Sequence, residues 1–169
     1  PRRRLLKRIA IAALVALAVL APQAASLSAR TLAPLVYTIR FPQPATKTFN
    51  VEVVVPTDKR ESVDLMMAIW SPGFYGIQNY AAQVSAFTAK AADGTVLDVA
   101  KPKASRWTVK TGGRPSVTVS YTLNAPRGSN LSNGVTETSA VIIGPSTYVT
   151  LAEQAHRPAE VRLELPASW

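Results

Sequence analysis

The chain has 169 residues, of which 47% are hydrophobic and 17% are charged, a composition typical of a globular domain and not of a disordered segment. The net charge is +9, but five of the 19 Lys and Arg residues lie at positions 2–8, which leaves 14 against 10 Asp and Glu elsewhere. These later charges are scattered and form no basic stripe with interleaved aromatics, so we expect no nucleic-acid partner.

The first 29 residues have the pattern of an export signal. A basic segment, RRRLLKR, precedes an apolar run of 13 residues from Ile9 to Ala21, and small residues follow in PQAASLSA. Because a membrane-spanning helix needs about 20 apolar residues, residues 1–29 are predicted to be a cleaved signal peptide, cut after Ser26 or Ser28, and no stable membrane anchor is expected. The mature protein would be periplasmic or extracellular in a bacterium, and the arginines at 2–4 leave both the secretory and the twin-arginine route open.

Residues 30–169 are predicted to form one all-β domain. Apolar and polar residues alternate at 37–41, 49–55, 117–123 and 161–165, which indicates strands with one buried and one wet face. Further short strands are predicted at 85–91, 96–99, 106–110, 140–143 and 147–151. The more uniformly apolar stretch Val63–Trp70 suggests a central strand covered on both sides, and residues 78–87 have room for one helical turn. About nine or ten short strands without a long amphipathic helix predict an antiparallel β-sandwich, which has no cysteine for disulfides.

Catalytic chemistry is sparse in this sequence. His156 is the single histidine, and with Glu153 and Glu160 nearby it lacks the register of a zinc site, so we interpret it as an exposed loop residue. Without a cysteine or a second histidine, neither a thiol dyad nor a Ser-His-Asp triad can be assembled. We therefore predict no catalytic residue, no metal ligand and no cofactor in this chain.

One loop, 70-WSPGFYGIQNY-80, holds four of the twelve aromatic residues. Pro72 should end strand pairing, and Gly73 after it allows the positive φ of a type II turn over Ser71–Phe74. The aromatics either plug the open end of the sandwich or form a surface that something else covers. The candidate interface or substrate-cleft residues are Trp70, Pro72, Gly73, Phe74, Tyr75 and Tyr80.

The order of these blocks resembles the N-terminal domain of the glycyl aminopeptidase family of zinc metallopeptidases. The blocks lie at 37–56, 65–87, 93–109, 117–123 and 161–169. In that family the loop reads W-[TS]-P-G-S-Y with a Tyr-Ala pair downstream, as in Trp70–Tyr75 and Tyr80-Ala81 here. Phe74 stands in place of the usual small residue, and Gln78-Asn79 replaces a basic-acidic pair.

The resemblance implies a non-catalytic domain. In that family a gluzincin domain follows, with the zinc ligands and the general-base Glu, and usually also a C-terminal PDZ domain. The implied role is to pack on this downstream catalytic domain of the same polypeptide and to help shape its peptide-substrate cleft. We therefore expect a polypeptide longer than this chain. Two alternatives remain: an exported binding module with Trp70, Phe74 and Tyr75 as a platform for peptide or carbohydrate, or a structural sandwich with an exposed edge strand.

Overall fold

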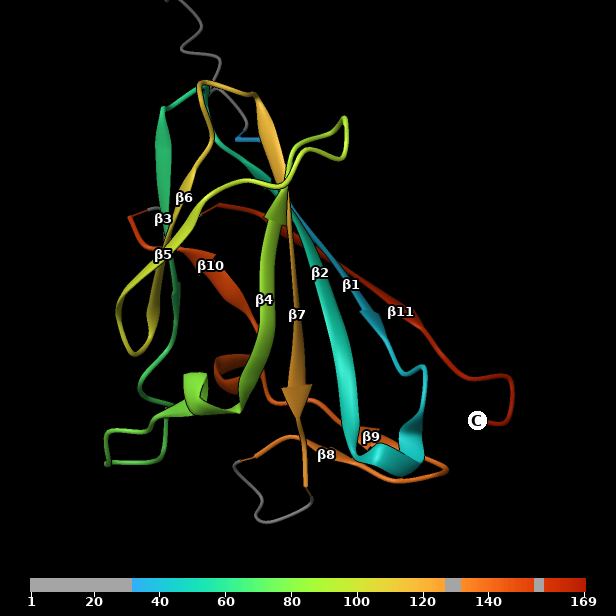
Figure 1. The fold of residues 1–169 in the computed structure, drawn as a ribbon. Coiled ribbons are helices and arrows are strands. Elements are labelled where there is room, and N and C mark those ends of the chain that lie inside the picture. Colours follow the sequence, from blue (N-terminus) through green and yellow to red (C-terminus); the bar gives the residue numbers. More distant parts are fainter. Residues whose placement is uncertain (1–31, 127–131, 154–156) are drawn as a thin grey trace, which may run out of the picture. The chain divides into compact units, whose positions relative to one another are not determined.

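The computed structural model describes residues 32–126, 132–153 and 157–169. Figure 1 shows these residues as strands joined by loops and a few short helical turns, which confirms the predicted all-β class. The predicted signal peptide at 1–29 and His156 lie outside the described residues. Within the described part of the chain, no helix is long and apolar enough to cross a membrane.

The larger of the two main sheets has five strands in the spatial order β11-β1-β2-β7-β4. All neighbours in this sheet are antiparallel except β1 and β11, which are parallel and align Tyr37 with Val161. A parallel pair needs a long connection, and here the connection is almost the whole domain. The strands are β1 (Leu35–Arg40), β2 (Thr48–Pro56), β4 (Val84–Lys90), β7 (Ser116–Asn124) and β11 (Ala159–Glu164).

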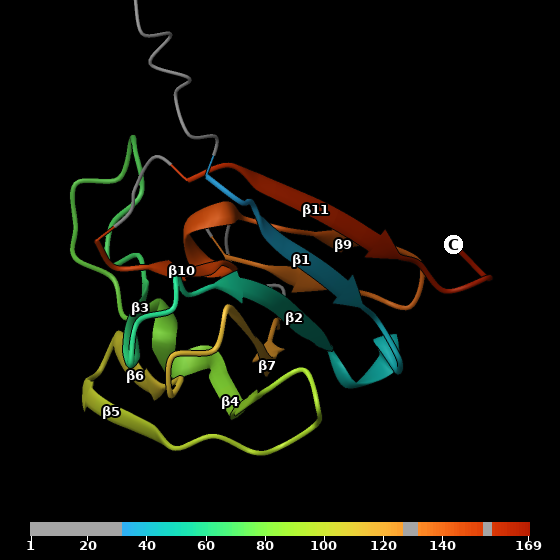
Figure 2. The same cartoon turned by 90° about the horizontal axis from the view of Figure 1, so that it is seen from above.

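The smaller main sheet has four antiparallel strands in the order β10-β3-β6-β5. Figure 2 shows its strands in a separate layer from β1, β2 and β11. Its strands are β3 (Ser62–Met67), β5 (Val99–Lys103), β6 (Arg106–Lys110) and β10 (Val149–Leu151). The remaining elements are a two-stranded ribbon of β8 (Gly134–Val135) and β9 (Ala140–Val141), and the 3₁₀ turns η1 (Pro44–Thr46), η2 (Tyr80–Gln83) and η3 (Gly144–Ser146).

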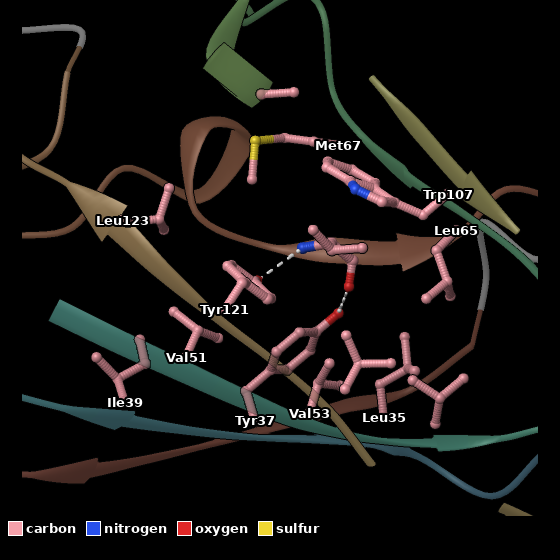
Figure 3. Close-up of a cluster of buried hydrophobic side chains, with 14 of the residues drawn as sticks. Leu35, Tyr37, Ile39, Val51, Val53, Leu65, Met67, Trp107, Tyr121 and Leu123 are labelled. Atoms are coloured by element: carbon pink, nitrogen blue, oxygen red, sulfur yellow. Dashed lines mark hydrogen bonds between the residues drawn. The ribbon is translucent and has the colours of Figure 1, made fainter. Parts of the chain in front are cut away.

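The core lies between the two main sheets, as the alternating sequence predicts. On β2 and β7 every second residue is buried, and the register pairs Val53 with Val119 on the inward face. Two tyrosines of the larger sheet also reach across to β10 (Figure 3). The Tyr37 hydroxyl donates to the Val149 carbonyl at 3.0 Å, and the Val149 amide donates to the Tyr121 hydroxyl at 3.1 Å. These buried polar groups of Tyr37, Tyr121 and Val149 are thus paired between the sheets, which avoids the cost of leaving them unsatisfied.

Two strand predictions need correction. Residues 96–99 do not form a strand, because Val96 makes only an isolated bridge to Lys90 and β5 begins at Val99. The strand predicted at 63–70 ends at Met67 and is buried on one face only, with Asp64 exposed. The outward face of β3 carries Ser62, Asp64 and Met66, and none of the three is buried.

β11 differs most from its predicted burial. Val161 and Leu163 align with Tyr37 and Ile39 of β1, whose side chains are buried. Residues opposite each other on paired strands share a face of the sheet, so Val161 and Leu163 are on the core side. They are nevertheless exposed, as is Leu165 beyond the strand. β11 is an edge strand, and Figures 1 and 2 both place it away from β3, β5 and β6. The smaller main sheet therefore does not cover Val161, Leu163 and Leu165, which we call the β11 stripe.

Candidate functional site

The aromatic loop begins where β3 ends, and its first part is the tight turn predicted from Pro72 and Gly73. The Phe74 amide donates to the Ser71 carbonyl at 3.1 Å, and Gly73 has φ +82°, which confirms the predicted chain reversal. A Cβ added at Gly73 would meet nothing within 4 Å. The turn therefore needs glycine for its backbone conformation and not for lack of space.

The base of the loop is tied to the core by two hydrogen bonds. The hydroxyls of Ser71 and Tyr80 lie 2.7 Å apart, and both residues are buried. The backbone N–H of Gln78 donates to the backbone carbonyl of Ile69 at 2.8 Å, and this bond joins the two ends of the loop. Tyr80 belongs to the hydrophobic core cluster, with only 8% of its surface exposed. The loop thus has a fixed base on a rigid sandwich.

The tip of the loop presents apolar side chains to the outside. Tyr75 is 96% exposed and Ile77 is 76% exposed, while Trp70 and Ile69 near the base are 46% and 43% exposed. We call these four residues the apolar loop surface. Four large apolar side chains exposed within nine residues of one loop make this loop a candidate for a contact with a partner or ligand. Sequence reasoning missed Ile69 and Ile77, although both lie in or next to the quoted loop.

The six candidate residues differ in burial. Tyr80 is a core plug, whereas Trp70 and Tyr75 face outward; Pro72 and Gly73 form the exposed turn between them, and Phe74 is half-buried. Burial thus differs along the loop, with Tyr80 in the core and Trp70 and Tyr75 exposed. This division could not be read from the composition of the loop, because all its aromatics have similar hydrophobicity.

A cleft of about 540 Å³ lies beside the loop, within the range of small-ligand sites. One side is formed by the loop and η2, and the other by the end of β7 and the segment that carries Asn133 and Ser146. In Figure 1 the green loop is at the end of the sandwich where β4 begins and β7 ends. Among the described residues that line the cleft, none is charged. Its polar groups include the carboxamides of Gln78, Asn79, Gln83 and Asn124.

The ionisable groups with altered pKa values do not face this cleft. Burial raises the pKa of Tyr37 to about 12, and burial also raises the pKa of Tyr121 well above its ordinary value. Both side chains belong to the core. In the described ranges, no group of three or more His, Cys, Asp or Glu is placed to hold a metal ion.

A family model described as the Peptidase M61 N-terminal domain matches residues 36–169. The chain belongs to this family. The match covers every described strand except the first residue of β1, so the sandwich as a whole is the M61 N-terminal domain.

Solved structures with a similar fold include one of an aminopeptidase N family protein. It is a crystal structure of the protein from Idiomarina loihiensis, with a TM-score of 0.72 and 21% sequence identity. The similarity covers 79% of this chain and 22% of that one, so this chain corresponds to about a fifth of the length of its structural neighbour. No curated protein matches the chain.

Proposed function

We propose that this chain is the non-catalytic N-terminal β-sandwich of an exported zinc-dependent aminopeptidase of the glycyl aminopeptidase type. It packs on a downstream catalytic domain of the same polypeptide and helps shape the cleft for the peptide substrate. The zinc and its ligands belong to that downstream domain. Membership of the Peptidase M61 N-terminal domain family supports the peptidase context.

The observation that carries the proposal is the apolar loop surface. Tyr75 and Ile77 expose most of their side chains, yet the base of the loop is anchored through Ser71 and Tyr80. An anchored loop with apolar groups at its tip is suited to contact another surface without a large entropy loss on ordering. The β11 stripe of Val161, Leu163 and Leu165 is a second uncovered apolar surface. Packing of a following domain on one or both would remove these groups from water.

The first test is to read the polypeptide that follows Trp169. An HExxH motif on a helix with a downstream Glu would supply the zinc ligands and general base that the proposal needs. Termination shortly after Trp169 would contradict it and would favour the alternative of a free-standing binding module.

The second test measures packing directly by amide hydrogen exchange. The chain and the longer polypeptide are compared at residues 69–77 and 159–165, with the core strand β7 as an internal control. We expect slower exchange at one or both surface segments in the longer polypeptide and little change in β7. Equal exchange at both surface segments in the two proteins would contradict the packing.

A further inference from the structure

The cleft beside the aromatic loop contains carboxamide groups that the fold does not use. Gln78 and Asn79 come from the loop, Gln83 from η2, and Asn124 is the last residue of β7. The side chains of Asn79, Gln83 and Asn124 have no hydrogen-bond partner among the described residues, and Gln78 Nε2 reaches only the Gly76 carbonyl, at 3.5 Å. We call this site the carboxamide cleft. Its polar groups are open to a ligand.

The inner part of the carboxamide cleft is rigid, because Asn133 is fully engaged. Its Nδ2 donates to the Ser146 carbonyl at 3.0 Å. Its Oδ1 accepts from the Ile143 amide at 2.7 Å and from the Thr147 hydroxyl at 2.9 Å. The buried side-chain carboxamide of Asn133 thus holds the segment 143–147 in place through three hydrogen bonds. The free carboxamides therefore surround a preformed base, which lowers the entropy cost of binding.

The chemistry of the described lining residues favours a neutral ligand. With no carboxylate among the described lining residues, these residues offer no counter-charge for the α-ammonium end of a peptide, for which a neutral carboxamide oxygen is a weaker acceptor. With no Lys or Arg among these described residues either, they supply no cation for a carboxylate or a phosphate. A carboxamide both donates and accepts hydrogen bonds. It thereby complements the peptide unit, which carries one N–H and one C=O per residue.

The aromatic residues distinguish a peptide from a sugar. A sugar site would need an open ring face next to the amides. Tyr75, the most exposed ring, is not part of the cleft lining, and the Phe74 ring packs against Gly76, where an added Cβ would lie 3.1 Å from Phe74 Cε1. Phe74 is half-buried and lines the cleft, where it can contact an apolar side chain of a ligand. These observations favour a peptide.

We propose that the carboxamide cleft binds the backbone of an uncharged, extended peptide segment away from its free amino end. Asn79, Gln83 and Asn124 would exchange hydrogen bonds with successive peptide units, and Phe74 would contact a side chain of the ligand. The inference rests on the proposed function, because in a peptidase this segment is the part of the substrate that does not react. Binding energy from such a segment can be used to position the scissile bond.

The test uses the ¹⁵N-labelled chain and the blocked peptide Ac-Ala-Ala-Ala-Ala-NH₂, which has no free amine. The side-chain NH₂ resonances of Asn and Gln report directly on the cleft. We expect concentration-dependent shifts at Asn79, Gln83 and Asn124, and a loss of affinity of about tenfold in Gln83→Ala/Asn124→Ala, as expected for removing two hydrogen-bonding groups. Gln43→Ala, an exposed glutamine before η1, is the matched control and should bind as the unaltered chain does.

Three outcomes would overturn the inference. The first is the absence of shifts at the cleft carboxamides at millimolar peptide. The second is an equal loss of affinity in Gln43→Ala. The third is binding of cellotetraose with the same resonances shifted and no response to the peptide, which would identify a sugar site.

A kinetic measurement on the longer polypeptide separates this inference from the proposed function. The cleft variant should lower kcat/KM for a neutral tetrapeptide and leave it unchanged for a one-residue aminoacyl amide, which is too short to occupy the cleft. An equal effect on both substrates would contradict the inference while leaving the proposed function intact. A longer polypeptide without peptidase activity, combined with peptide shifts in the chain, would contradict the proposed function alone.

Discussion

The hydroxyls of Ser71 and Tyr80 lie 2.7 Å apart, where the aromatic loop leaves and rejoins the sandwich. Both residues are buried, and the two most exposed residues of the loop, Tyr75 and Ile77, lie between them in the sequence. This contact separates the loop into a base that belongs to the core and a tip that does not. The two parts should respond differently to substitution.

Replacement of Tyr80 by Phe should destabilise the chain by about 1–3 kcal/mol, because the buried Ser71 hydroxyl then loses its partner. The double change Ser71→Ala/Tyr80→Phe should recover part of this loss, since no buried hydroxyl is left unpaired. Urea denaturation followed by tryptophan fluorescence measures both. A Tyr80→Phe variant as stable as the unaltered chain would contradict the importance of this contact.

Replacement of Tyr75 by Ala should change the unfolding free energy of the chain by less than about 0.5 kcal/mol, because the side chain is almost fully exposed. Phe74→Ala should cost more, since Phe74 is half-buried. In the longer polypeptide, Tyr75→Ala should impair activity or domain docking. If both variants cost the chain the roughly 3–5 kcal/mol of a buried aromatic truncation, the loop tip is part of the core and has no interface role.

Replacement of Gly73 by Ala should cost about 1–2 kcal/mol, because φ +82° is unfavourable for a residue with a Cβ. Space is not the cause, since nothing lies within 4 Å of the added atom. Gly144→Ala is the matched control, with its nearest contact at 3.9 Å and no positive φ. The two melting curves should therefore separate, and similar curves would contradict the conformational argument.

Replacement of Val161 and Leu163 by Thr should leave the chain nearly as stable, because both side chains are exposed and Thr keeps the preference for a strand. In the longer polypeptide the same double variant should lose stability if a following domain covers β11. Thermal denaturation of both proteins, with and without the change, measures the difference. Equal small effects in the two proteins would leave the apolar loop surface as the proposed contact.

Alkaline pH should destabilise the fold through its buried tyrosines. In the unfolded chain Tyr37 loses its proton near pH 10.0, whereas burial keeps it protonated in the folded chain up to a pKa of about 12. Between these values the unfolded state binds fewer protons, so stability is complete below pH 10 and falls as the pH rises. Tyr37→Phe should lower stability at pH 8 and flatten the decline above pH 10. An unchanged slope in this variant would contradict the assignment to Tyr37.

The amino-acid pattern by itself determined the all-β class and the local turn of the loop. Alternation with a period of two is a property of each strand, and it correctly marked the inward residues of β2 and β7. The turn at Pro72 and Gly73 depends on the φ preferences of those two residues. Such features need no knowledge of distant parts of the chain.

The position of a strand within the sandwich was decided only by the tertiary structure. β11 alternates as regularly as β2, yet its apolar residues remain exposed because it pairs with β1 at the edge of the larger sheet. Local alternation identifies which residues share a face, but burial depends on whether another layer lies over that face. The same limit explains why 63–70 was predicted to be covered on both sides.

The candidate site also depends on tertiary contacts. Tyr75 and Tyr80 have the same side chain and lie five positions apart, but Tyr80 is in the core and Tyr75 is at the loop tip. The carboxamide cleft joins Gln83 to Asn124, residues that are brought together because β4 pairs with β7. A polar residue at a strand end carries no local sign of its neighbours across the sheet, since strand pairing brings together residues that are far apart in the sequence.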